Sequence, residues 1–523
     1  MRTLLSLAVL CAASAAQDQG AELARICSGS GGVARLSKLG ESLGGRQIDL
    51  ITVAAEGPVP ENERPAILCV AGLDGTRKLG PALAIEHLRH LVDDHRNGDA
   101  TTRQLLADKV VFIVPMLSPD AFALQRSGNA RALDLDRDGR TDEDAPRDLD
   151  GDGRVCQMRW RDVDGEWVID DRDPRLMRKA DRKKGERGTH SLAPECADAD
   201  GDGSRGEDDG QGVAIFRNFA QRHTEFDRRA GLFPMSEPET RALADFVFAH
   251  RNIVMAFVWD GDDNLLATPK SDSAKPRIQR DGVHEDDVPL FERIGALYRQ
   301  RTSRSGASSP RMDGSLWAWL YLQAGIPTFA SDVWRVPRGG KEGEVVTTDD
   351  QARIAQCDKL KTGFAPWHAF RHPELGEVEV GGFVQGHDDE LCSSDERSTI
   401  FAAHHGFLLE VAAMGSRTSI RSFTRKALGD GVFRLEATVV NDGSWPTLCA
   451  MAEETRRFGR PRIQLVGDGV ELLAGERRVE LRTLDAAGGK VEASWIVSGK
   501  AGATVGVELV VDPIGKDRKE VTL

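Results

Sequence analysis

The stretch Pro65-Ala-Ile-Leu-Cys-Val-Ala71-Gly72 is an apolar run that ends at a glycine, a pattern typical of a buried β-strand. Apolar runs at residues 48–53 and 110–114 predict two more strands, and residues 81–92 have the spacing of a helix. Strands that alternate with helices favour an α/β fold with a largely parallel sheet covered by helices on both faces. The pattern continues with predicted helices at 237–250, 286–301 and 315–324 and predicted strands at 253–258 and 328–333.

The whole chain has the composition of a large soluble protein. It has 523 residues, of which 40% are hydrophobic and 29% are charged, and a domain typically has roughly 150 residues. The net charge is 69 − 83 = −14, which argues against general nucleic-acid binding because that function needs a basic surface. After the first residues, no stretch is apolar enough to predict a membrane span.

Residues 1–16 have the layout of an export signal. Arg2 supplies a positive start, residues 4–13 are an apolar core, and Ser14-Ala15-Ala16 supplies small residues for cleavage. We therefore expect a secreted or periplasmic protein. No cysteines in the rest of the chain have metal-ligand spacing. A Cys156–Cys196 disulfide is the first pairing to consider, and ordinary thiols throughout are the alternative.

Acidic, glycine-rich loops recur within residues 131–210. Each has the pattern Asp-x-Asp-x-Asp-Gly, in which alternate carboxylates converge and the glycine permits a sharp turn, as in calcium loops. The aspartates of the successive loops are Asp134, Asp136 and Asp138; Asp148, Asp150 and Asp152; and Asp198, Asp200 and Asp202. An acid occupies the twelfth position only in the third loop, as Asp209, whereas Ala145 and Arg159 take that place in the others. We expect structural calcium that pins this insertion, and a solvated acidic surface is the alternative.

The character of the sequence changes near residue 419. Short apolar or alternating segments separated by turn residues follow at 433–440, 463–466, 479–481, 492–497 and 504–511. Such repeated short strands are typical of an all-β unit. We expect residues 419–523 to form a β-sandwich domain.

Several segments between Gly44 and the C-terminus resemble the zinc carboxypeptidases, the carboxypeptidase A-like metallopeptidases. Besides the 65–72 strand, Leu117-Ser118-Pro119-Asp120-Ala121 stands where the family has an Asn-Pro-Asp-Gly turn, and residues 212–219 stand where it has Asp-Leu-Asn-Arg-Asn-Phe. Residues 325–334 resemble the strand that carries the catalytic glutamate. The chain is similar to large bacterial secreted members with calcium-type insertions and a C-terminal β domain. The resemblance implies a carboxypeptidase-like mixed sheet over residues 25–418.

The residues that this resemblance assigns to zinc are replaced. The family binds zinc through a His-x-x-Glu pair and a later histidine, with an open position for the reactive water. Here the matching positions are Asp74, Arg77 and Asp260; a register shift of one would put Trp259 third, and histidine is absent either way. A guanidinium has no lone pair for a metal. We expect Asp74 and Asp260 to clamp Arg77 in the metal's volume, and the alternative is that Arg77 points to solvent.

The other catalytic positions implied by the resemblance are altered or only partly kept. Asp332 stands at the general base, one methylene shorter than the family's glutamate, and such a loss of reach can cost about a hundredfold in rate. Arg217 stands where the family's arginine binds the substrate carboxylate, a task suited to a bidentate guanidinium. Arg131 is matched less closely, to an arginine that stabilises the oxyanion.

Together these features predict a secreted member of the zinc carboxypeptidase family whose metal site is degenerate and whose catalysis is lost. Its cleft is expected to bind the C-terminus of a peptide or protein. One alternative is an active metallocarboxypeptidase that releases C-terminal residues through an altered metal site. Another is a calcium-dependent adhesion or scaffold protein. The sequence predicts no particular oligomeric state.

Overall fold

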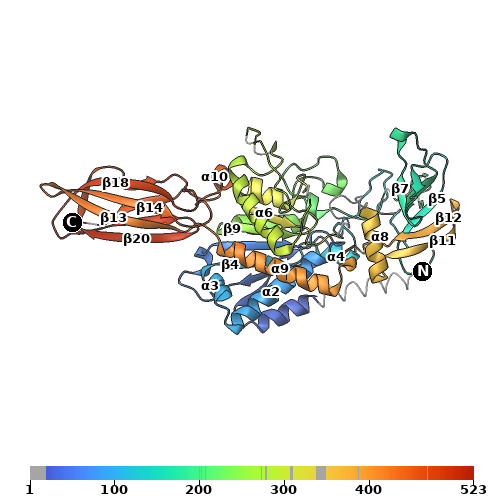
Figure 1. Cartoon of the computed structure of the whole chain (residues 1–523), viewed down its shortest axis with the longest axis horizontal. Coiled ribbons are helices and arrows are strands. Elements are labelled where there is room, and N and C mark those ends of the chain that lie inside the picture. Colours follow the sequence, from blue (N-terminus) through green and yellow to red (C-terminus); the bar gives the residue numbers. More distant parts are fainter. Residues whose placement is uncertain are drawn as a thin grey trace.

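The computed structural model of this chain describes residues 19–523, apart from residues 200, 202, 207, 273, 277–278, 307–309, 337–348, 387 and 468. The export signal expected at residues 1–16 and two of the expected calcium ligands, Asp200 and Asp202, lie outside the described residues. A C-terminal β unit, a central α/β region and a smaller sheet follow one another along the longest axis (Figure 1). Among the helices of the described residues, none has the length and apolar character that crossing a membrane requires.

The central sheet has the strand order β1-β2-β4-β3-β9-β10. Its strands are β1 (Ala34–Glu41), β2 (Gln47–Val53), β3 (Ala66–Ala71), β4 (Val110–Val114), β9 (Ile253–Trp259) and β10 (Thr328–Ser331). Strands β4, β3, β9 and β10 run parallel to one another, whereas β2 pairs antiparallel with both β4 and the edge strand β1. Every residue of β3 and β4 is buried, as expected of strands covered on both faces. The predicted, largely parallel α/β sheet is confirmed.

Helices cover both faces of this sheet. They are α2 (Leu79–Asn97), α3 (Ala100–Asp108), α4 (Pro119–Leu124), α5 (Pro238–Ala249), α6 (Val288–Thr302), α7 (Leu316–Ala318) and α9 (Ser394–Ala413). A further helix, α8 (Asp349–Leu360), lies beside the smaller sheet (Figure 1). Phe257 of β9 packs against Phe407 of α9, and Phe112 of β4 packs against Phe246 of α5. Cys69 of β3 pairs with both Phe257 and Ile113, so these two side chains point to the same face of the sheet. Phe112 is the neighbour of Ile113 along β4 and therefore points to the opposite face. Helices α9 and α5 therefore lie on opposite sides of the sheet.

One predicted helix has an irregular form in the structure. The segment expected to be helical at residues 315–324 forms only a short α turn, α7, and then continues as a π-helix over Trp319–Gln323. Widened helical turns of this kind are frequent at functional sites. Trp317 of α7 also lines the candidate site described below.

The acidic insertion is more than a set of loops, because it contributes strands to a second sheet. This sheet has the order β11-β12-β5-β8-β6-β7. Its strands are β5 (Gln157–Arg161), β6 (Trp167–Ile169), β7 (Met177–Lys179), β8 (His190–Pro194), β11 (Phe364–His372) and β12 (Gly376–Phe383). Met158 of β5 and Val380 of β12 are paired and belong to a small apolar core. The insertion is thus held by strand pairing and apolar packing with a much later part of the chain.

The disulfide expected between Cys156 and Cys196 is not formed. Both side chains are buried in the small core of the second sheet, and the cysteines of the described chain are thiols. Burial raises the pKa of the Cys156 thiol to about 12, which opposes thiolate formation.

The C-terminal region forms the predicted β-sandwich. One sheet has the order β13-β14-β18-β16 and the other β17-β15-β19-β20. The strands are β13 (Thr418–Gly429), β14 (Val432–Asn441), β15 (Arg462–Val466), β16 (Val470–Ala474), β17 (Arg478–Glu480), β18 (Gly489–Gly499), β19 (Thr504–Val511) and β20 (Gly515–Thr522), with helix α10 (Ala450–Glu454) between β14 and β15. Leu435 and Trp495 from the first sheet share a core with Ile463 and Val507 from the second.

Candidate functional site

The candidate site lies at the carboxyl edge of the parallel strands in the central sheet. Asp74 lies in the loop after β3, whereas Asp260 and Asp332 directly follow β9 and β10. Because β3 pairs with β9 and β9 with β10 in parallel, the loops after these strands meet at one edge. In α/β proteins this edge is the usual place for a ligand.

Asp74, Arg77 and Asp260 line one small cavity of about 80 Å³. The remaining lining residues are Leu73, Phe216, Val258, Gly261, Asp262, Arg311, Leu316 and Trp317. Trp259, the alternative to Asp260 in the sequence, is buried beside His87 of α2. The structure therefore brings the singled-out residues together with Asp260 in the third place, and Arg77 faces this cavity.

The carboxyl groups of Asp74 and Asp260 are held by donors of the first loop. Asp74 Oδ1 accepts hydrogen bonds from the backbone N–H and the hydroxyl of Thr76, at 2.9 and 2.7 Å. Asp260 Oδ2 accepts the backbone N–H of Leu73 at 2.9 Å, whereas Oδ1 has no hydrogen-bond partner among the described residues. Burial raises the pKa of both carboxyls, and for Asp260 the neighbouring Asp74 adds to the effect.

Arg77 supplies a permanent positive charge in this cavity. Within the described part of the chain its guanidinium forms no ion pair within 4.0 Å, so the expected direct clamp by Asp74 and Asp260 is not formed. Burial lowers the pKa of Arg77, but the carboxylates of Asp389, Asp260, Asp74 and Asp332 together raise it above its ordinary value. Arg77 therefore stays charged and acts on the carboxyl groups through space.

Asp332 is enclosed by two arginines. Its side chain is buried, and Arg304 Nη2 lies 2.5 Å from Oδ1. Arg335 Nε forms a second ion pair, with Oδ2. The next residue, Val333, has a φ of 61°, which is rare for a β-branched residue. Both carboxylate oxygens of Asp332 thus face guanidinium groups.

Arg217 lies in a second cavity that adjoins the first. This cavity has a volume of about 330 Å³, and its lining includes Arg217, Arg229 and Arg311. Phe216 and Arg311 line both cavities, and the Arg311 guanidinium lies 4.6 Å from the centroid of the Phe216 ring. We call this second space the arginine cavity.

The arginines of the arginine cavity differ in how their charges are balanced. Arg217 Nη2 lies 2.5 Å from Asp227, and Arg229 Nη2 lies 2.8 Å from Asp209. In the residues that the structure describes, Arg311 has no carboxylate within 4.0 Å of its guanidinium. An anion that enters this cavity therefore meets a guanidinium whose hydrogen-bonding capacity is not taken up by an ion pair.

A family model described as zinc carboxypeptidase matches residues 23–341, more than half of the chain. The chain belongs to the zinc carboxypeptidase family. A second model, described as a domain of unknown function, matches residues 417–522. Carboxypeptidase D from Mus musculus is 27% identical to this family member over an alignment of 137 residues, and the match covers 24% of this chain. The match spans only 10% of the length of that relative.

Similar solved structures include two with low sequence identity. Bovine thrombin-activatable fibrinolysis inhibitor, in complex with tick carboxypeptidase inhibitor, is 11% identical with a TM-score of 0.39, and the match covers 76% of this chain and 95% of that chain. A metallo-carboxypeptidase from Burkholderia cenocepacia is 12% identical with a TM-score of 0.36, and the match covers 75% and 68% of the two chains.

Arg131, the residue matched to the family's oxyanion arginine, lies outside both cavities. Its Nε is 3.0 Å from each carboxylate oxygen of the fully buried Glu237. Asn129 Nδ2 also donates to Glu237, at 2.7 Å. This geometry gives Arg131 the role of neutralising a buried carboxylate, and the expected contact with a substrate is not supported.

Sequence reasoning missed the arginines that surround the predicted residues. Arg335 follows Asp332 at the i,i+3 spacing, and this proximity is a signal that could have suggested their ion pair. Arg304 and Arg311 carry no such signal, since each lies in a loop that is distant in sequence from Asp332 and from Arg217. Only the fold brings them to Asp332 and to the arginine cavity.

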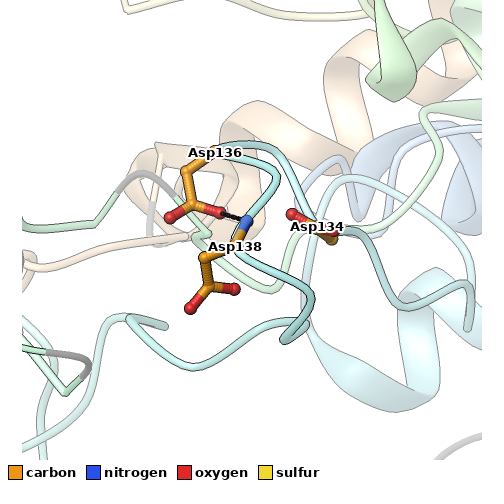
Figure 2. Close-up of side chains that lie close together, drawn as sticks. All are labelled: Asp134, Asp136 and Asp138. Carbon is orange, nitrogen blue, oxygen red and sulfur yellow. Dashed lines mark hydrogen bonds between the residues drawn. The ribbon is translucent and has the colours of Figure 1, made fainter.

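The acidic loops gather carboxylates into close groups. Within the described residues these groups are Asp134, Asp136 and Asp138; Asp136, Glu143 and Asp208; and Asp148, Asp150 and Glu195, with the ligand oxygens of each group within 4.8 Å of one another. Figure 2 shows the first group on a single turn, where Asp136 Oδ1 accepts the backbone N–H of Asp138 at 3.0 Å.

Some of the expected calcium residues lie outside these groups. Asp152 Oδ1 accepts the backbone N–H of Arg154 at 2.8 Å, and Asp198 accepts the backbone N–H groups of its own loop. Asp209, expected at the twelfth position of the third loop, instead forms its ion pair with Arg229. Glu143, Glu195 and Asp208 were missed because they lie outside the repeated loop pattern.

Proposed function

We propose that this protein is a catalytically inactive, secreted or periplasmic member of the zinc carboxypeptidase family that binds the C-terminal carboxylate of a peptide or protein. The observation that carries the proposal is the charged Arg77 in the cavity formed with Asp74 and Asp260. A fixed organic cation at this place opposes the binding of a dication, because like charges repel.

The residues at the family's metal position do not suit zinc. Catalytic zinc is held by three protein ligands chosen from histidine, cysteine and carboxylates. Asp74 and Asp260 offer two carboxyl groups, and a guanidinium offers no lone pair. In the described residues, groups of three metal-ligating side chains lie in the acidic loops and not around this cavity.

The surroundings of Asp332 support the loss of catalysis. A general base must accept a proton from the attacking water. Both oxygens of this carboxylate instead form ion pairs, one with Arg304 and one with Arg335. Asp332 is therefore better suited to holding two arginines in place than to proton transfer.

The arginine cavity supports carboxylate binding. Guanidinium groups bind carboxylates through two parallel hydrogen bonds, and Arg217 and Arg311 both line this cavity. Its volume of about 330 Å³ lies within the range of small-ligand sites, about 300–1,000 Å³. We expect the terminal carboxylate to contact these two arginines.

Calorimetry with a peptide that has a free C-terminus, and with the same peptide amidated, tests this function. Arg217→Gln and Arg311→Gln should each weaken binding of the free peptide by about tenfold or more, because each removes a charge-assisted hydrogen bond. Arg425→Gln, an exposed arginine of β13, is the matched control. Equal binding of both peptides would contradict the proposal.

A metal and activity assay on the same preparation separates this function from its main rival. After dialysis we expect no stoichiometric zinc and no release of C-terminal residues. Stoichiometric zinc together with release of C-terminal residues would establish the alternative, an active metallocarboxypeptidase.

We also propose that the acidic loops bind structural calcium. Gly139 and Gly153 have φ values of 96° and 85°, as the sharp turn of a calcium loop requires. Grouped carboxylates repel unless a cation neutralises them, and calcium prefers oxygen ligands. Calcium should raise the melting temperature, and chelation should lower it. A partner protein captured only in the presence of calcium would favour an adhesion or scaffold function instead.

A further inference from the structure

The first acidic loop lacks an acid at its twelfth position, yet acids from outside the loop pattern lie against it. Carboxylate oxygens of Asp136, Glu143 and Asp208 all lie within 4.8 Å of one another. Two oxygens on opposite sides of a calcium ion are about 4.6–5.2 Å apart, because each Ca–O distance is about 2.3–2.6 Å. The spacing of the three carboxylates therefore accommodates one ion between them.

Asp208 is the buried member of this group. Only 1% of the surface of Asp208 is exposed. Oδ1 accepts the backbone N–H of Leu135 at 2.5 Å, whereas Oδ2 has no hydrogen-bond partner among the described residues, and the same holds for Glu143 Oε2. A buried, unpaired carboxylate oxygen is unfavourable, and a bound cation removes this penalty.

The group joins two segments that are far apart in the sequence. The hydrogen bond from Leu135 to Asp208 ties the first loop to the end of the third. The backbone N–H of Ala199 donates to Asp144 Oδ1 at 2.7 Å and so ties the start of the third loop to the segment after the first. A cation shared by Asp136 and Asp208 therefore clips together loops that already touch.

The group of Asp136, Glu143 and Asp208 is also close in sequence to residues that line the arginine cavity. Asp209, the residue after Asp208, forms the ion pair with Arg229. Gln211 and Gly212 then line the cavity. An ion at Asp208 therefore fixes the backbone just before this wall.

We propose that one calcium ion is bound by Asp136, Glu143 and Asp208, and that it joins the first and third acidic loops beside the arginine cavity. The inference rests on the proposed calcium binding of the acidic region and assigns to it two ligands, Glu143 and Asp208, that the loop pattern does not contain. Calcium suits the site because all ligands are oxygens on irregular loops, whereas magnesium demands near-octahedral geometry and zinc favours nitrogen and sulfur.

Calcium titration of the full-length protein by calorimetry tests this site. Asp208→Asn and Glu143→Gln keep the side-chain shapes but each removes one charge. Each variant should bind one calcium ion fewer than the wild type, or bind that ion at least about tenfold more weakly, since even an outer-shell ligand partner is commonly worth this factor. Asp171→Asn is the control, because Asp171 lies in the same insertion, has a 92% exposed side chain and belongs to none of the groups.

Melting temperatures with and without a chelator separate a ligand role from a folding defect. In chelator both variants should melt at or above the wild-type temperature, because each relieves repulsion between carboxylates. In calcium the wild type should gain more than either variant. Calcium binding by the wild type that is unchanged in both variants would overturn the assignment to these residues while leaving calcium binding by the loops intact. A wild type that binds no calcium would overturn both proposals.

Discussion

Replacement of Arg77 by methionine tests whether its charge stabilises the carboxyl groups of the small cavity. Methionine keeps much of the apolar stem and removes the guanidinium. Arg77 acts on Asp260 and Asp74 from beyond 4.0 Å, and unit charges about 5 Å apart interact by about 3 kcal/mol at an effective dielectric constant near 20. We therefore expect Arg77→Met to lower the free energy of unfolding by up to about 3 kcal/mol at pH 8.

The size of this loss should depend on pH. Burial and Asp74 raise the pKa of Asp260 in the folded state, whereas Arg77 lowers it, so the variant moves this pKa further up. A carboxyl whose folded pKa exceeds its unfolded pKa of 3.8 contributes stability at low pH that is lost as the pH rises through the folded pKa. Near pH 5 the carboxyl keeps its proton more often, so the missing charge matters less. The gap between wild type and variant should grow from pH 5 to pH 8.

Urea unfolding followed by tryptophan fluorescence at pH 5, 6.5 and 8 measures this gap. Arg77→Lys is the control, since it keeps a positive charge at the same position and should lose much less stability than Arg77→Met. A gap that stays constant across this pH range, or equal losses in the two variants, would refute the electrostatic reasoning.

Two further predictions concern buried ionisable side chains near the same site. His404 is buried against Tyr298, and burial lowers its pKa from 6.5 to about 3. The free energy of unfolding of the wild type should therefore fall as the pH drops below 6.5. Between pH 7.5 and pH 5 this loss should amount to about 2 kcal/mol in the wild type and should be absent in His404→Phe. Profiles of unfolding free energy against pH that run parallel in the two proteins would contradict this. Asp332→Asn removes the nearer of two carboxylates paired with the largely buried Arg304 and leaves only Asp263, at 3.5 Å, so it should cost about 3 kcal/mol in urea unfolding. Arg335→Met removes a partner of Asp332 that is 53% exposed and should cost about 1 kcal/mol or less. Equal losses of unfolding free energy in Asp332→Asn and Arg335→Met would contradict this prediction.

The central sheet could be predicted because its strands carry their own signal. β3 and β4 are short, wholly apolar runs that end up buried on both faces. β20 has no such signal, since Gly-Lys-Asp-Arg-Lys-Glu-Val-Thr is mostly charged and exposed, and its strand form depends on antiparallel pairing with β19. The second sheet was missed for a similar reason, because β5 pairs with β12 from a distant part of the chain.

The sequence by itself determined the residue types available at the candidate site. Through the family resemblance, it predicts that Asp74, Arg77 and Asp260 stand at the family's metal positions. Only the tertiary structure decided that Arg77 acts from a distance, and that Arg304 and Arg335 enclose Asp332. It alone placed Asp208 against Asp136. Strand formation follows from local side-chain periodicity, whereas contacts between distant charged side chains depend on how the loops pack.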